Sequence, residues 1–161
     1  MKRTILLSIL LAAGLAALSA QQWEEYDPFG GEIYGEKTGS TLNVQQVGNT
    51  LVFSGSANEK SAGYVLESAN LRLNGKNRIM LRVSGITNAD QFSTGKLLKL
   101  ELNGKPVIAQ VGSNINDMNF INARNGEYIF DIAHIENILK INLVFYNCNL
   151  RQNLSVTIFT E

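Results

Sequence analysis

The chain has 161 residues, with 14 basic and 14 acidic side chains, one His and one Cys. Balanced charge creates no field that would attract a polyanion, which argues against nucleic acid as a partner. A single Cys excludes an internal disulfide, and one His with one Cys excludes a zinc site built mainly from such ligands.

The first 20 residues have the features of a secretory signal peptide. Lys2 and Arg3 precede an apolar run from Ile5 to Leu18, and small residues follow up to Ala20. The run is shorter than the roughly 20 residues that a spanning helix needs, so we expect no retained transmembrane segment. We predict an exported protein, periplasmic or extracellular, with one domain over residues 21–161. Loss of Lys2 and Arg3 leaves this domain slightly acidic.

Residues 21–40 mix acidic, aromatic and Gly residues. Because Gly30, Gly31, Gly35 and Gly39 interrupt any regular element, we predict an irregular N-terminal arm lying across the domain. Its aromatic residues either cap the core or form a platform for a ligand. Its carboxylates suit a hard cation such as Ca²⁺, although their spacing matches no loop motif. The acidic residues are Glu24, Glu25, Asp27, Glu32 and Glu36, and the aromatic ones are Trp23, Tyr26, Phe29 and Tyr34.

Short apolar runs separated by Gly and Asn predict strands between residues 42 and 83. Residues 42–44 and 51–54 flank Gly48-Asn49 and are typical of a hairpin. Further runs occupy residues 63–67 and 71–73. After the turn at Asn74-Gly75, residues 79–83 place Ile79, Leu81 and Val83 on one face and Met80 and Arg82 on the other, which we expect to be the wet face.

The next segment holds the strongest hairpin signal. Leu98, Leu100 and Leu102 alternate with Lys99 and Glu101, and Asn103-Gly104 then leads into a returning strand over residues 106–111. Residues 112–126 follow as a long polar loop that includes Phe120, with at most one short strand near residues 119–123. One helical turn is expected over residues 133–139.

Three alternating runs close the chain, at residues 127–132, 138–146 and 154–159. Val144, Tyr146 and Phe159 lie on the phase opposite the core and are too apolar for water, so we expect the arm or a partner to cover them. The predicted core phase comprises Tyr128, Phe130, Ile132, Ile141, Leu143, Phe145, Val156 and Ile158.

Turn signals about every 8–12 residues, almost no helical pattern and no internal repeat predict an all-β fold in one domain, an antiparallel sandwich or barrel. Catalytic groups are scarce. His134 and Cys148 form no recognisable dyad, and a buried structural thiol is the better interpretation of Cys148. A hydrolase would need two strand carboxylates facing each other across a groove. We therefore expect a non-enzymatic protein without a cofactor. The strand carboxylates are Glu67, Glu101, Glu127 and Asp131.

The order of the runs at residues 63–68, 79–85, 127–132 and 141–145 resembles that of the galactose-binding-like jelly rolls, which include many carbohydrate-binding modules. The resemblance is one of pattern. It implies a jelly-roll β-sandwich that binds glycans on a concave sheet face or in edge loops, often with a structural Ca²⁺. This chain departs from the pattern in having few aromatic residues at outward positions.

These observations predict an exported binding module that recognises a glycan or another cell-envelope ligand through loops and one sheet face. The alternative is a structural envelope component, such as a coat or adhesin subunit, that acts by protein contact. Balanced charge and the scarcity of aromatic residues favour that alternative. The predicted ligand contacts are Trp23, Tyr34, Arg82, Phe120 and Tyr146.

Overall fold

The computed structural model describes residues 22–35, 39–58, 62–67, 71, 73, 75–88, 92, 95–110 and 119–161. The leader expected over residues 1–20 lies outside these ranges. So do Glu36 of the arm, Arg72, Asn74 of the expected second turn, Val111 at the end of the expected returning strand, and residues 112–118 of the polar loop. No helix in the described part of the chain is long and apolar enough to cross a membrane.

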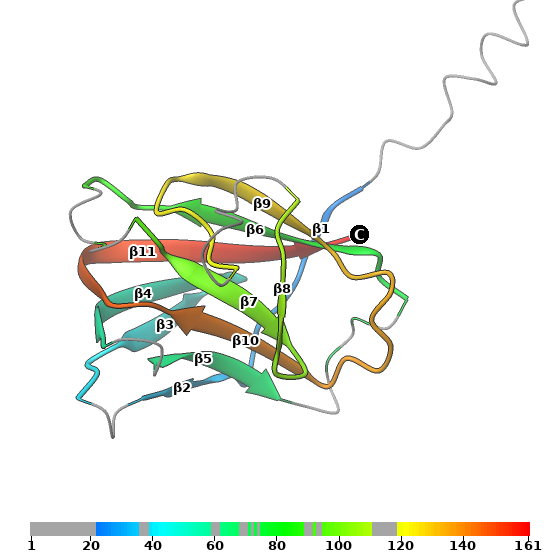
Figure 1. Ribbon diagram of the computed structural model, residues 1–161, viewed down its shortest axis with the longest axis horizontal. Coiled ribbons are helices and arrows are strands. Elements are labelled where there is room, and N and C mark those ends of the chain that lie inside the picture. The colour runs from blue at the N-terminus through cyan, green and yellow to red at the C-terminus, as the bar shows by residue number, and fades with distance from the viewer. Residues whose placement is uncertain are drawn as a thin grey trace, which may run out of the picture.

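Two antiparallel sheets pack face to face as a β-sandwich, and the described residues include no helix (Figure 1). The six-stranded sheet has the order β3-β4-β11-β6-β9, and β1 pairs with the end of β11. Its strands are β1 (Glu24–Glu25), β3 (Asn43–Val47), β4 (Thr50–Ala57), β6 (Arg78–Ser84), β9 (Gly126–Asp131) and β11 (Cys148–Thr160). The five-stranded sheet has the order β2-β5-β10-β7-β8. Its strands are β2 (Glu32–Tyr34), β5 (Ala62–Glu67), β7 (Leu98–Leu102), β8 (Lys105–Val107) and β10 (Lys140–Phe145).

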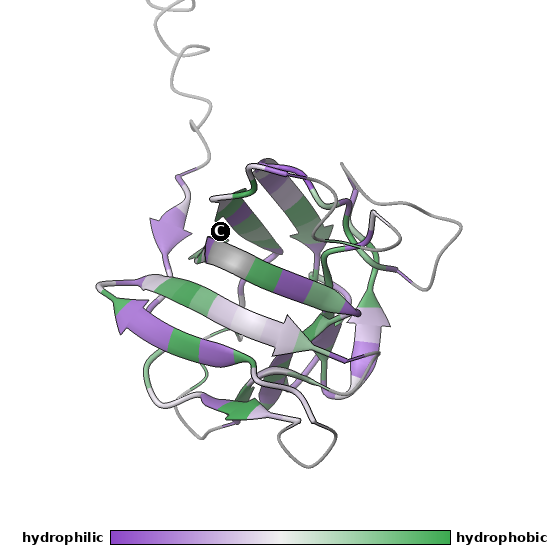
Figure 2. Ribbon diagram, turned by 90° about the vertical axis from the view of Figure 1, so that its left-hand side faces the viewer, coloured by the Kyte–Doolittle hydropathy of each residue, from purple (hydrophilic) through white to green (hydrophobic). Residues whose placement is uncertain are grey.

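Alternation along the strands builds the core between the sheets, and hydrophobic and hydrophilic positions follow one another along several strands in Figure 2. In β7 the three Leu side chains are buried, while Lys99 and Glu101 point to the outer side. All eight residues predicted for the core phase of the closing strands are buried, which confirms that register. Phe53 of β4 and Phe145 of β10 meet across the core with ring centroids 4.9 Å apart.

Both predicted hairpins are present. β3 and β4 join through Gly48-Asn49, and β7 and β8 join through Asn103 and Gly104, with φ of 51° and 77°. Pro106 lies on an edge strand, where its missing N–H costs no ladder bond. The returning strand is shorter than predicted, because β8 ends at Val107 and Ala109 then bridges to Phe130 in the other sheet.

Two further expectations about local structure are wrong. Residues 133–139 contain no helical turn: a single turn at residues 133 and 134 is closed by the hydrogen bond from Ile135 N to Ile132 O, and Asn137 and Leu139 are bonded to Asn103 of the β7–β8 hairpin. Leu71 and Leu73 are buried but belong to no strand. In these segments Leu71, Leu73 and Ile138 fill the core without the backbone joining a sheet, whereas Leu139 is exposed.

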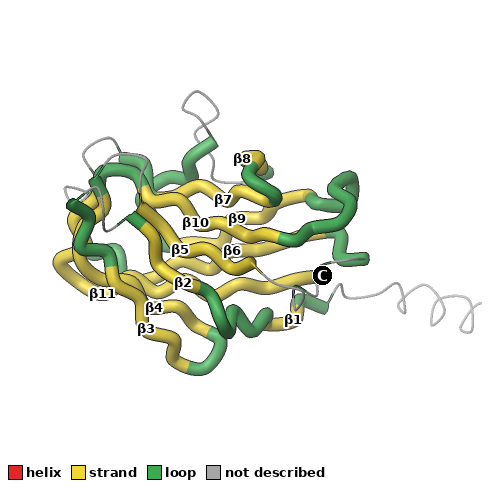
Figure 3. The backbone as a smooth tube through the Cα atoms, turned by 90° about the horizontal axis from the view of Figure 1, so that it is seen from below, coloured by secondary structure: helices red, strands yellow, loops and turns green. Residues whose placement is uncertain are grey.

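The N-terminal arm is more regular than expected, since it gives one short strand to each sheet. Figure 3 shows the chain passing from β1 to β2 along one side of the sandwich. Tyr26 N donates to Ile158 O of β11, and Tyr64 Oη of β5 donates to Pro28 O at 2.5 Å. Gly31 lies against the Tyr64 ring, where a Cβ would come within 2.1 Å of the hydroxyl. The arm thus joins the two sheets at this side.

Candidate functional site

Three of the five predicted ligand contacts gather on the outer side of the five-stranded sheet. We call this surface the tyrosine face: the outward side chains of β2, β5, β7 and β10, together with Lys96, Phe120 and Tyr146. The strand register sets Tyr34 beside Gly63, Gly63 beside Val144, and Val144 beside Lys99. One row of the face therefore runs across four strands.

Tyr34 begins this row and lies across Gly63. A Cβ added to Gly63 would stand 2.6 Å from Tyr34 Oη and 2.9 Å from its Cζ, so the end of the ring occupies the space of the missing side chain. The same Cβ would stand 2.2 Å from the carbonyl oxygen of Leu143 on β10. Gly63 is thus required both by the strand packing and by the position of the half-buried Tyr34 ring.

A polar network continues from the Tyr34 hydroxyl across β10 to β7. The Asn142 side-chain amide hydrogen-bonds that hydroxyl and also donates from Nδ2 to Glu101 Oε2 at 3.3 Å. Lys99 Nζ lies 2.6 Å from Glu101 Oε1, and both of these side chains are largely buried. Burial raises the pKa of Tyr34, and the nearby Glu101 carboxylate raises it further, whereas the Asn142 hydrogen bond opposes both effects. The hydroxyl therefore keeps its proton at neutral pH.

Asn142 also carries an unused acceptor. Its Oδ1 atom is buried and receives no hydrogen bond from the residues that the structure describes. Buried polar atoms without a partner are uncommon and costly in folded proteins. The atom belongs to the same side chain that connects Tyr34 to Glu101.

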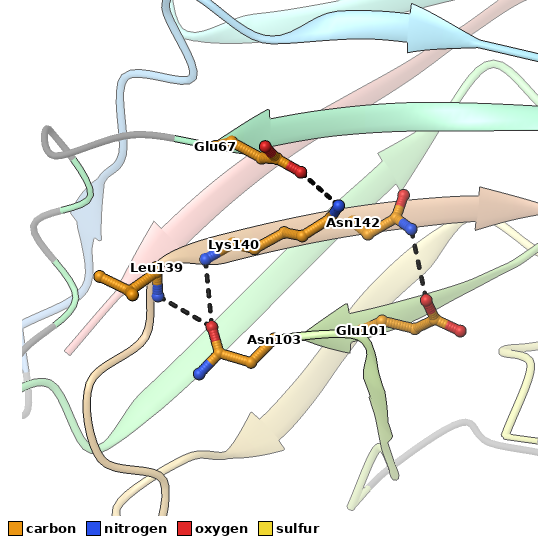
Figure 4. A network of polar contacts seen from close by, with 6 residues as sticks. All are labelled: Glu67, Glu101, Asn103, Leu139, Lys140 and Asn142. Carbon is orange, nitrogen blue, oxygen red and sulfur yellow. Dashed lines mark hydrogen bonds and ion pairs between the residues drawn. The ribbon is translucent and has the colours of Figure 1, made fainter.

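The network extends toward one end of the sheet, as Figure 4 shows. Lys140 of β10 pairs with Glu67 of β5, its direct cross-strand neighbour. At the hairpin, Asn103 Oδ1 accepts hydrogen bonds from Leu139 N and Lys140 N, and its Nδ2 donates to Asn137 O. This side chain fixes the start of β10 against the end of β7.

An aromatic and cationic cluster lies at the opposite end of the tyrosine face. The Phe120 and Tyr146 rings are 5.2 Å apart, and Lys96 Nζ lies 4.8 Å from the centre of the Tyr146 ring. Lys99 Nζ lies 5.5 Å from the Phe120 ring. Phe120 is fully buried, so its ring supports Tyr146 from below and is closed to a ligand. Tyr34 and Tyr146 are the partly exposed rings of the face.

The other two predicted contacts belong to the opposite sheet. Trp23 precedes β1, and the guanidinium of Arg78 lies 5.2 Å from the centre of its ring. Arg82 is exposed on β6, lies 4.4 Å over the Phe159 ring and pairs with Glu127. The five residues that the sequence grouped together therefore divide between two outer surfaces.

Phe159 and Val144, two of the apolar residues expected to be shielded from water, are covered mainly by neighbouring side chains. Phe159 is covered by Arg82 and lies beside Glu25 of the arm, so the wet face predicted around Arg82 contains a buried apolar strip that includes Met80. Val144 is 4% exposed and lies in the row that Tyr34 begins. The arm thus supplies part of the predicted cover.

The groups considered for catalysis fall at several places in the fold. Cys148 is buried, and burial raises its pKa to about 11, as expected for a structural thiol. His134 is exposed and lines a hollow of about 600 Å³ beside β8, together with Asp131 and Glu136. No three His, Cys, Asp or Glu side chains form a metal site within the described ranges. Glu67 and Glu101 lie on the tyrosine face, whereas Glu127 and Asp131 are on the other sheet.

No protein-family model, curated protein or solved structure matches this chain.

Sequence reasoning found the tyrosines of the face but missed the residues that connect them. Lys99, Glu101 and Asn142 are outward positions in the alternation, but alternation alone does not identify their neighbours. Gly63 gave no signal, since nothing in the chain links it to Tyr34 before the β2–β5 pairing is known.

Proposed function

We propose that this protein is an exported, non-enzymatic binding module of jelly-roll topology that recognises a glycan on the tyrosine face. The carrying observation is the half-buried Tyr34 ring laid over Gly63, with its hydroxyl bonded to Asn142, which in turn donates to Glu101. Sugars offer an apolar ring face and a rim of hydroxyls. A flat aromatic ring beside amide and carboxylate groups suits both.

The jelly-roll assignment is supported by the strand order. Counted from β4, the larger sheet contains β4-β11-β6-β9 and the smaller one β5-β10-β7-β8. From β4 to β11 the chain therefore changes sheet at every step except between β7 and β8, as expected when a long antiparallel hairpin is wrapped into a double Greek key. β1, β2 and β3 extend this eight-stranded arrangement at its N-terminal side.

The charges of the tyrosine face favour a neutral glycan. Lys99 pairs with Glu101 and Lys140 pairs with Glu67, so these four charges compensate one another. Paired charges offer directional donors and acceptors without a net field that would select an acidic sugar. Tyr146 and Tyr34 then provide the apolar contacts at two places on the face.

Binding to neutral oligosaccharides tests the proposal. The released protein is screened on a glycan array and titrated calorimetrically with the best neutral ligand. Tyr34→Ala and Tyr146→Ala are each expected to weaken binding about tenfold, because each removes an aromatic contact of about 1 kcal/mol or slightly more. Trp23→Ala is the matched control on the other sheet and should leave the affinity unchanged. Absence of binding to every neutral glycan at millimolar concentration would contradict the proposal.

Export is part of the same proposal and has its own measurement. The basic start and the apolar run up to Ala20 support removal of a leader. Sequencing the N-terminus of the protein released by its host should find a start near Gln21. A cytoplasmic product that still carries Met1 would refute export while leaving glycan binding to be judged separately.

A further inference from the structure

Among the described strands, β3 and β9 are the outermost in the larger sheet and β2 and β8 in the smaller one, while β1 adds a two-residue edge of Glu24 and Glu25 beside β11. A free edge presents unpaired N–H and C=O groups to any other extended chain. Natural proteins protect such edges with charged residues, Pro, short strands or covering segments. The four outermost strands of this sandwich differ sharply in that protection.

Three of them are protected. β2 and β8 are each three residues long. β2 carries Glu32, and β8 carries Lys105 and Pro106. β9 carries Glu127 and Asp131. Its backbone is also partly covered, because Gln110 N donates to Ile129 O at 2.7 Å.

β3 carries no charged residue or Pro of its own, and the arm reaches it through one side chain, since Gln46 Nε2 donates to Asp27 Oδ1 at 2.9 Å. It is five residues long, Asn-Val-Gln-Gln-Val, and pairs with β4 in an unbroken register from Asn43 to Val47. Four of the five residues are exposed, and Val47 is 57% exposed. Charged residues make up 17% of the chain, yet none occurs from Gly39 to Asn58. Among the strands assigned in the described ranges, none pairs with β3 on its far side.

We propose that β3 is a self-association edge, which pairs antiparallel with β3 of a second copy and joins two six-stranded sheets. Such a two-fold contact brings the same strand of both copies together, with the central residue opposite its own equivalent, so charges on the edge would meet like charges. An uncharged edge avoids that repulsion. Because it has no charge to attract or orient a charged peptide, a second copy is the favoured occupant.

The sequence of β3 is compatible with such a two-fold axis. Centred on Gln45, the pairing sets the two Gln45 residues opposite each other and each Asn43 opposite Val47 of the other copy. Side-chain amides stacked between strands hydrogen-bond one another, as in Gln and Asn ladders. The contact is small, so we expect weak, reversible association that is significant at high local concentration. Paired copies would present two tyrosine faces and gain avidity for a repetitive ligand.

Disulfide trapping tests the proposed pairing directly. In either hydrogen-bonding phase, the two Gln45 Cα atoms would lie about 4.5–5.5 Å apart, within the range of a disulfide. Under mild oxidation Gln45→Cys should form mostly disulfide-linked dimer. Leu139→Cys, at a 64% exposed position away from β3, is the matched control, and the wild type with its buried Cys148 gives the baseline. Equal cross-linking of both variants, or none in either, would overturn the proposal.

A second variant tests the same edge without a new thiol. Gln45→Lys places like charges at the centre of the pairing, and the exposed position should tolerate the change, which circular dichroism checks. Light scattering at increasing protein concentration should show association of the wild type and its loss in the variant. A wild type that stays monomeric at millimolar concentration, or association unaffected by Gln45→Lys, would also overturn the proposal.

Discussion

Substitution of Gly63 by Ala tests how the tyrosine face is built into the sheet. The new methyl group would lie 2.2 Å from the Leu143 carbonyl oxygen and 2.6 Å from Tyr34 Oη, whereas ordinary contact begins at 3.4 Å. The tyrosine ring can move aside, but the carbonyl belongs to a strand paired on both sides. Two paired strands must therefore separate locally by about 1 Å. We expect a loss of about 3 kcal/mol in the free energy of unfolding, at the upper end for overpacked cores.

Urea unfolding followed by circular dichroism measures this loss, which corresponds to a fall of about 10 °C in Tm. Gly75→Ala is the matched control, since Gly75 has φ of +83° and no atom within 4 Å of an added Cβ. It should cost only the backbone strain of about 1 kcal/mol. The double variant Gly63→Ala/Tyr34→Ala should remain destabilised, because the Leu143 carbonyl clash persists. A Gly63→Ala protein as stable as the Gly75→Ala protein would refute this packing argument.

Two other predictions concern pH and the β7–β8 hairpin. The pKa of Cys148 rises on folding from 9.0 to about 11, and burial also raises those of Tyr34, Tyr64 and Tyr128. Because these groups bind their protons more tightly in the folded protein, the stability that they contribute is complete below about pH 9 and is lost as the pH rises toward 11. Urea unfolding at a series of pH values measures this loss. A free energy of unfolding that stays constant between pH 9 and 11 would contradict the prediction. Asn103→Ala removes three hydrogen bonds and replaces an Asn, which tolerates the backbone φ of 51°, by a residue that does not. It should lower the free energy of unfolding, measured in urea, by about 2–3 kcal/mol. Asn103→Asp keeps the accepting oxygen and should cost less; equal losses would contradict this assignment.

Much of the fold could be predicted because alternation and turn chemistry are local properties. Three apolar Leu with Lys99 and Glu101 between them suffice to predict β7, and Asn103-Gly104 suffices to predict its hairpin. The end of β8 could not be predicted, since Ala109 leaves one sheet to bridge to the other. The strands of the arm were missed for a similar reason. β1 is two residues long and β2 three. Each forms by pairing with a longer strand, β1 with β11 and β2 with β5.

In the candidate site, too, the local properties could be predicted and the contacts between distant segments could not. Tyr34 and Tyr146 could be identified as partly exposed aromatic residues, but their common surface depends on strand order. Alternation alone could not separate them from Trp23 and Arg82, which the β1–β11 and β6–β11 pairings assign to the other sheet. Phe120 was an aromatic in a polar loop, and only its packing beneath Tyr146 explains why it is buried.

The most direct test of the glycan-binding proposal is to locate the ligand by NMR. Isotope-labelled protein is titrated with the best neutral oligosaccharide, and backbone amide shifts are followed to saturation. The proposal predicts saturable changes in β2, β5, β7 and β10, centred on Asn142 and Val144, with little change around Arg82 on β6. Changes centred on Arg82 and Trp23, or in the hollow beside His134, would contradict the assignment of binding to the tyrosine face.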